Sequence, residues 1–244
     1  MITLFEDPQN TWELVANGLP WTLTLAFSSL AIGFVLAVLL ALARLSSIAP
    51  LRWFAYAYVY FFRSTPLLVQ IFLIYYGLAQ FDVVQQSAFW PFLREAYWCA
   101  ILSLTLNTTA YSSEIIRGGL QSVPWGQVEA AKACGMSTWL RFKRVVFPQA
   151  IRQALPGYGN EIVLMIKSTS LASTITLLDM TLFARKETSA TFSIEPLFIA
   201  AVFYLVINFL ATRGVMMLEY RLTPELRDVK RVRPLPDADL AKVH

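Results

Sequence analysis

The 244-residue sequence contains little charge and few of the residue types that carry out catalysis. Charged residues make up 15% of the chain, against roughly 25% in soluble proteins. Apolar residues make up 57%, whereas a soluble domain has about 45–50%. Both deviations argue against an ordinary soluble enzyme, a disordered chain and a nucleic-acid-binding protein, although the formal net charge is +4.

Chemically reactive residues are equally scarce. The two cysteines, Cys99 and Cys134, cannot build a disulfide framework and are not spaced as metal ligands. The one histidine is the last residue, His244, which excludes histidine-based catalysis and a histidine metal site. No G-x-x-x-x-G-K-S/T phosphate-binding loop is present. We therefore expect no catalytic residue, metal or cofactor in this chain, so energy for uphill transport has to come from a partner or an ion gradient.

Long apolar segments make up much of the sequence. Five of them are long enough for a membrane-spanning helix, which needs about 20 residues: residues 19–43, 54–79, 97–120, 159–183 and 196–218. Helices are expected because lipid offers no hydrogen-bond partner to backbone groups. The first basic residue is Arg44, so the N-terminus lacks the basic region of a cleavable signal peptide. We predict an all-α membrane protein with five transmembrane helices.

Basic residues indicate the orientation. They cluster at Arg44 and Arg52, in residues 117–152 and in residues 213–242. With five crossings these clusters share one side, which the positive-inside rule places in the cytoplasm, with the N-terminus outside. We therefore predict a membrane domain at 1–218 with a basic cytoplasmic loop at 121–158, and a cytoplasmic tail at 219–244. Binding of the loop to the bilayer surface is the alternative role for its charges.

The cytoplasmic loop contains a short helix signal. Glu129, Ala130 and Ala131 are followed, after three residues, by Gly135. The small alanines allow another surface to approach closely, and glycine suits the position just after a helix end. Ser137 can cap the helix that follows. Such a helix–glycine–helix elbow is suited to act as a lever for a soluble partner.

The spacing of this loop resembles the E-A-A, three residues, G, nine residues, I-x-L-P loop of ABC-importer permeases. Pro148 matches the final proline, and Val145 and Phe147 replace the isoleucine and leucine. Three further stretches resemble the spans of polar amino-acid permeases. They are Arg63-Ser64-Thr65-Pro66-Leu67-Leu68-Val69-Gln70, then Asn107-Thr108-Thr109-Ala110-Tyr111-Ser112-Ser113-Glu114 with Arg117-Gly118-Gly119, and Asn160-Glu161 with Lys167-Ser168-Thr169-Ser170-Leu171. The stretch around residues 168–185 is similar overall to the M-type subunit of histidine/lysine/arginine/ornithine and opine systems.

The resemblance implies a type I ABC importer permease in the bacterial cytoplasmic (inner) membrane. Its implied partners are a similar second permease, two ATPase subunits that bind ATP and Mg, and a periplasmic or extracellular amino-acid-binding protein. Alternating access is the implied mechanism, in which this chain supplies half of the pathway. The implied ATPase-coupling residues are Glu129, Ala130, Ala131, Gly135, Ser137 and Pro148.

Two other classes of protein remain as alternatives. A self-sufficient ion-coupled secondary transporter needs no ATPase and often shows repeated halves, and no internal repeat is evident in the sequence. A membrane-bound enzyme needs a cluster of acidic, histidine or cysteine residues at one interface, and none is seen.

Polar residues inside the predicted spans are candidates for a substrate pathway. They are Asn107, Tyr111, Glu114, Glu161, Ser168 and Ser170. The first three share one helix face by their spacing, and polar groups at membrane depth should face protein or a cavity. We expect Glu161 to pair with the cationic end of a basic amino acid and Asn107 to bond its α-carboxylate or amine.

Four of these candidates also have a purely structural interpretation. Asn107 and Ser168 could join packed helices by hydrogen bonds. Glu114 and Glu161 could pair with a nearby cation. Pro66 removes a backbone donor and predicts a kink, where Arg63 could bond the freed carbonyls or a neighbouring acid.

Overall fold

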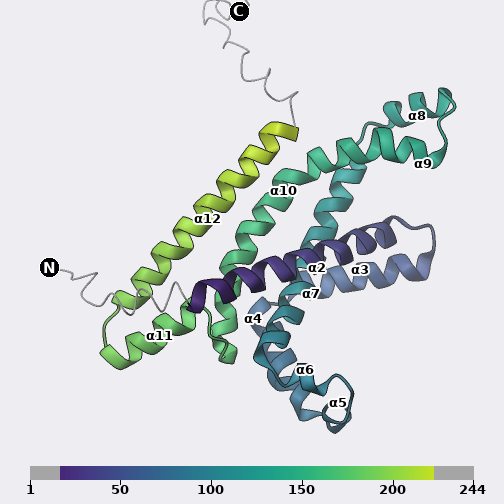
Figure 1. The fold of residues 1–244 in the computed structure, drawn as a ribbon. Helices are drawn as coiled ribbons and strands as arrows, with labels where there is room; N and C mark the ends of the chain where they lie inside the picture. The colour runs from purple at the N-terminus through teal and green to yellow at the C-terminus, as the bar shows by residue number, and fades with distance from the viewer. Residues whose placement is uncertain (1–16, 223–244) are drawn as a thin grey trace, which may run out of the picture.

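The computed structural model describes residues 17–222, and within that range the chain consists of helices joined by short loops, without strands (Figure 1). The α-helices are α2 (Leu19–Leu45), α3 (Ala49–Ser64), α4 (Leu67–Phe72), α5 (Asp82–Gln85), α6 (Trp90–Leu93), α7 (Ala96–Gln121), α8 (Trp125–Ala133), α9 (Thr138–Arg141), α10 (Phe147–Ser168), α11 (Met180–Thr191) and α12 (Glu195–Leu222). Short π- or 3₁₀-helices are η2 (Leu73–Gly77), η3 (Leu78–Gln80), η4 (Phe142–Val146) and η5 (Thr169–Ile175). The all-α prediction is confirmed.

The expected first and last spans correspond to α2 and α12. These two helices are long and apolar enough to cross a membrane, and the number rises to four if each of two bent helix pairs is one span. Residues 219–222 of the predicted tail belong to α12. Residues 223–244 of that tail, like the first 16 residues, lie outside the described range.

The third expected span, α7, is 26 residues long but is less apolar than the helices that qualify as membrane spans by composition. It is the central helix of the structure, packed against α2, α3 and α10. Its buried side chains include Ser103, Thr105, Thr108 and Ser112. Because neighbouring helices rather than lipid cover this helix, it needs less apolar surface than a lipid-facing span. A count of five crossings therefore stays a prediction.

A glycine and two tyrosines hold neighbouring helices together around α7. A Cβ at Gly33 of α2 would lie 2.4 Å from Thr108 Cγ2, so only glycine allows this approach. Tyr58 of α3 donates to the Leu106 carbonyl at 2.8 Å. Tyr158 of α10 donates to the Leu30 carbonyl at 3.4 Å. The interior of the described chain is thus built on three helices, α2, α7 and α10.

The predicted kink at Pro66 is a sharp break, since α3 and the helix that starts at Leu67 are bent by 105°. Proline cannot donate the bond that the Phe62 carbonyl would normally accept. Gln70 replaces it, because its Nε2 donates to the carbonyls of Phe62 at 2.9 Å and Thr65 at 3.1 Å. The sequence left two partners open for Arg63, these carbonyls or a neighbouring acid. Within residues 17–222 the carbonyls are bonded by the buried Gln70 amide instead, and Arg63 forms no ion pair.

The expected fourth span, residues 159–183, is not one helix. α10 starts earlier, at Phe147, and continues through Pro148 in its first turn and Pro156 in its interior. The helix then tightens into η5, where Thr169 and Ser170 donate to the carbonyls three residues before them, both at 2.7 Å. Such bonds compete with helical backbone bonding.

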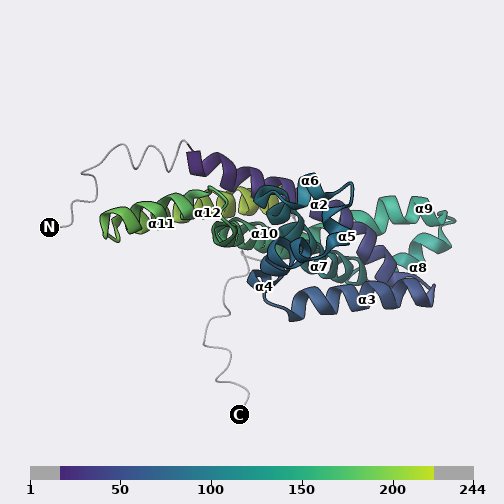
Figure 2. The ribbon, with the colours of Figure 1, turned by 90° about the horizontal axis from the view of Figure 1, so that it is seen from below.

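A left-handed residue, Thr176 (φ 65°), ends η5, and Asp179 starts α11. The Asp179 side chain is fully buried and accepts from the Leu182 N–H at 2.8 Å, which caps the helix. Two views place α11 and the pair α8–α9 at opposite ends of the described structure (Figures 1 and 2).

Candidate functional site

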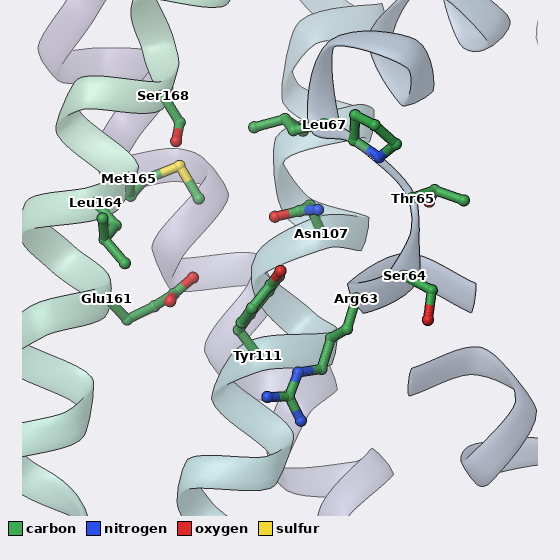
Figure 3. A pocket seen from close by; sticks show the side chains of 11 residues that line it. Arg63, Ser64, Thr65, Leu67, Asn107, Tyr111, Glu161, Leu164, Met165 and Ser168 are labelled. Atoms are coloured by element: carbon green, nitrogen blue, oxygen red, sulfur yellow. The ribbon is translucent and has the colours of Figure 1, made fainter. Parts of the chain in front are cut away.

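A cavity of about 440 Å³ lies between the α3–α4 break, the middle of α7 and α10 (Figure 3). Its lining residues are Arg63, Ser64, Thr65, Pro66, Leu67, Asn107, Tyr111, Glu161, Leu164, Met165 and Ser168. Four of the predicted pathway residues are therefore brought together: Asn107, Tyr111, Glu161 and Ser168. The other two, Glu114 and Ser170, do not line it.

Glu161 supplies a buried acid to this cavity. Its relative exposure is 7%, and Oε1 accepts a hydrogen bond from the Thr108 hydroxyl at 2.7 Å. It forms no ion pair within residues 17–222. A buried carboxylate is costly unless it is paired, so this position suits a cationic group that enters the cavity.

Asn107 is oriented by the break in the neighbouring segment. Its Nδ2 donates to Gln70 Oε1 at 3.0 Å and to the Phe62 carbonyl at 3.4 Å. Figure 3 shows the amide oxygen on the side of α10 and the nitrogen on the side of the break. An asparagine has two donors, and both are used here. Asn107 therefore offers the cavity an acceptor, which suits an amine and not a carboxylate.

Arg63 is the charged residue that sequence analysis did not assign to the pathway. Its guanidinium carbon lies 5.2 Å from the centre of the Tyr111 ring, a cation–π contact. Figure 3 shows Tyr111 between Arg63 and Glu161. The signal that would have found Arg63 is its depth, since a charge near the middle of a predicted span is a functional candidate by default.

Glu114 has the alternative role that the sequence left open. Its Oε1 lies 3.2 Å from Arg44 Nε of α2, and its Oε2 lies 2.7 Å from the Arg117 guanidinium one turn along α7. Glu114 thus joins the ends of two helices instead of facing the cavity. Ser170 donates to the Lys167 carbonyl at 2.7 Å, also away from the cavity.

The elbow has the local structure that its motif predicts. Gly135 has a φ of +75° and donates to the Lys132 carbonyl at 3.0 Å, and Met136 donates to Ala131 at 3.1 Å. This pair of bonds is the Schellman motif that ends α8. Ser137 caps α9 by accepting from the Leu140 N–H at 3.3 Å.

The surface of the elbow is apolar at two prominent positions. Trp125 is 72% exposed and Trp139 is 70% exposed. Trp125 Nε1 donates to Glu129 Oε1 at 2.7 Å, which places the motif glutamate against the first helical turn. Ala130 is exposed and Ala131 is buried. The alanine pair therefore presents one small residue to solvent and uses the other for packing.

A direct contact connects the elbow to α10. Gln149 Nε2 donates to Gln127 Oε1 of α8 at 2.6 Å and to the Val145 carbonyl at 2.9 Å. Pro148 lies beside them at the start of α10. The same helix carries Glu161 further along, so one continuous helix runs from the elbow to the cavity.

Comparison with known proteins identifies the family to which the chain belongs. Residues 18–224 match the family described as binding-protein-dependent transport system inner membrane component. The chain belongs to this family. It is thus the membrane permease subunit of an importer, located in the bacterial inner membrane, and it works with other subunits. Self-sufficient transport and membrane-bound enzyme activity are thereby set aside.

Relatives of the permease narrow its position in the family. It is 54% identical to the octopine transport system permease protein OccM of Rhizobium meliloti, over 95% of this chain and 96% of the relative. It is 59% identical to the nopaline transport system permease protein NocM of Agrobacterium fabrum, over 85% and 87%. It is 42% identical to the histidine/lysine/arginine/ornithine transport system permease protein HisM of Escherichia coli K12, over 79% and 82%.

A solved structure agrees with the fold of the permease. A chain of the crystal structure of an amino acid ABC transporter with histidines superposes with a TM-score of 0.76 at 36% identity, covering 85% of this chain and 94% of that one. The type I importer permease fold expected from the sequence is confirmed. Within residues 17–222, no group of three or more His, Cys, Asp or Glu is placed to hold a metal ion.

Proposed function

We propose that this permease forms half of the translocation pathway of an ATP-driven importer of basic amino acids. The observation that carries the proposal is the continuity of α10, which begins at Phe147, contacts the elbow through Gln149 and carries Glu161 at the cavity. A displacement at the elbow would therefore move one wall of the cavity. The names of the relatives, which include permeases for basic amino acids and for opines, support the substrate class.

The proposed complex contains a second, similar permease, two ATPase subunits that bind ATP and Mg, and an amino-acid-binding protein outside the membrane. The elbow of α8 and α9, with its exposed Trp125 and Trp139, is the proposed contact with an ATPase subunit. The coupling residues proposed there are Glu129, Ala130, Ala131, Gly135, Ser137 and Pro148. The membrane domain spans 1–218 with its loop at 121–158, and the tail at 219–244 is cytoplasmic.

Alternating access is the mechanism that we propose, and the geometry supports it. Closure of the ATPase subunits would draw the elbows together, and each elbow is joined to α10 by the Gln127–Gln149 hydrogen bond. Because α10 and α7 are linked by the Thr108–Glu161 hydrogen bond at 2.7 Å, a shift of α10 changes the surroundings of the acid. The cavity would then open outward for the binding protein and inward after ATP hydrolysis.

Substrate recognition rests on Glu161 and Asn107. The Glu161 carboxylate is proposed to pair with the cationic end of the substrate, and Asn107 Oδ1 to accept from an amine. A hydrogen bond to a charged group contributes about 1.5–3 kcal/mol, or roughly one to two powers of ten in affinity. Such a pairing would favour arginine, lysine or histidine over a neutral amino acid.

The test compares Glu161→Gln with Glu114→Gln in the assembled importer. We expect Glu161→Gln to reduce uptake of arginine and histidine by about 10- to 100-fold more than uptake of any neutral amino acid the complex accepts. Glu114→Gln removes an acid outside the cavity and should not change the preference. Equal losses for cationic and neutral substrates with Glu161→Gln would leave the acid with a structural role. Transport restricted to acidic amino acids would overturn the charge argument.

A further inference from the structure

We infer that Arg63 binds the α-carboxylate of the transported amino acid, opposite Glu161. The inference rests on the proposed function, in which this cavity takes a basic amino acid. Among the residues that line the cavity, the charged ones are Arg63 and Glu161. They come from different helices, α3 and α10. A basic amino acid carries two cationic groups and one carboxylate, so the carboxylate needs a donor that Glu161 cannot supply.

Other polar groups at the cavity are less suited to be that donor. Both amide hydrogens of Asn107 are directed at Gln70 and Phe62. The Thr65 hydroxyl donates to the Phe61 carbonyl at 2.9 Å. Neutral hydroxyls remain on other lining residues, but a carboxylate away from bulk water is strongly stabilised only by a charged donor or several hydrogen bonds. Arg63 is the cation that the cavity provides.

Arg63 contacts the Tyr111 ring and donates no hydrogen bond to any residue in 17–222. A guanidinium has five N–H groups, and the cation–π contact places its carbon over the face of the Tyr111 ring. The Cζ-to-ring distance is 5.2 Å. Arg63 forms no ion pair with any residue in 17–222. A planar guanidinium matches a carboxylate with two parallel hydrogen bonds, so Tyr111 can hold the side chain while its N–H groups bind the substrate.

Figure 3 supports this division of the cavity. Glu161 extends from α10 on one side of Tyr111, and Arg63 approaches from the end of α3 on the other side. Asn107 lies one helical turn before Tyr111 and presents an acceptor. The two charged ends of an amino acid would therefore be bound by two opposite charges on separate helices, with Asn107 available for the amine.

The test uses the purified importer complex without its binding protein and measures equilibrium binding of arginine and of argininamide, in which a neutral amide replaces the carboxylate. The wild-type complex should bind arginine about 10- to 100-fold more tightly than argininamide. Arg63→Gln should remove most of that preference by weakening arginine binding alone. Arg63→Lys keeps the charge but not the paired geometry, and should retain part of the preference. Arg94→Gln, an exposed arginine outside the cavity, is the matched control and should leave both affinities unchanged.

Two outcomes overturn the inference. If the wild-type complex binds arginine and argininamide with equal affinity, no group in the cavity recognises the carboxylate, whatever the result for the Arg63 variants. An Arg63→Gln complex that weakens both compounds to the same degree shows a structural role. These results are distinct from failure of the proposed function, in which Glu161→Gln leaves arginine binding unchanged or neither compound binds the wild-type complex.

Discussion

The side chain of Gln70 donates to the carbonyl of Phe62 at 2.9 Å, across the break made by Pro66. The same Gln70 accepts from Asn107 Nδ2 at 3.0 Å with its oxygen. One buried amide therefore closes the end of α3 and orients a residue of the candidate site. The break and the cavity are thus one structural unit, because the group that satisfies the broken helix also aims Asn107.

We expect Gln70→Leu to disturb both functions of this amide. The Phe62 and Thr65 carbonyls would lose a buried donor, which costs about 1–3 kcal/mol. A lower melting temperature of the detergent-purified complex should accompany weaker substrate binding, because Asn107 loses its orientation. Gln80→Leu, at an exposed glutamine in the same segment, serves as the control. If Gln70→Leu behaves like this control, the amide does not hold the break.

Gly135→Val tests the elbow. Valine at a φ of +75° is strained, so the Schellman turn should distort and the direction of α9 should change. Substrate uptake and substrate-stimulated ATP hydrolysis should be lost while the permease remains in the membrane. Gly126→Ala, where an added Cβ meets no atom within 4 Å, is the control. Glu129→Lys should likewise abolish transport. Import at the wild-type rate by either elbow variant would exclude this loop as the coupling element.

The contact between α10 and α12 gives a prediction about stability. A Cβ at Gly159 would lie 2.2 Å from Val215 Cγ1, so Gly159→Ala should force the helices apart. Overpacking of this kind costs about 1–3 kcal/mol. Val215→Ala in the same chain should restore much of the loss, and a double-mutant cycle of thermal unfolding measures the coupling. Additive effects of the two substitutions would show that the helices do not meet here.

Topology is tested with reporters. A reporter fused after His244 should be active only in a cytoplasmic assay, and one inserted beside Gln86 only in a periplasmic assay. The physical reason is the excess of Lys and Arg near the elbow and the C-terminus. The opposite pattern of activities would reverse the orientation and place the elbow outside the cell.

Local features were predictable from the sequence because their causes are local. Gly135 and Ser137 act on backbone groups within a few residues, so their roles at the ends of α8 and α9 were correctly predicted. The apolar runs behind α2 and α12 are likewise continuous in the chain. The expectation of one helix over 159–183 was wrong because hydroxyls near Thr169 compete for backbone carbonyls, an effect that average hydropathy does not capture.

The sequence by itself determined the helical class, the outer spans, the elbow and the family motifs, since each depends on composition or on neighbours along the chain. The tertiary structure alone decided which polar residues meet. Glu114 accepts a hydrogen bond from Arg44, 70 residues away in the sequence. Glu161 accepts one from the Thr108 hydroxyl, 53 residues away, and remains at the cavity. Two acids with similar sequence surroundings thus acquire different roles, because a charge is paired by whatever the packing of distant helices brings within hydrogen-bond distance.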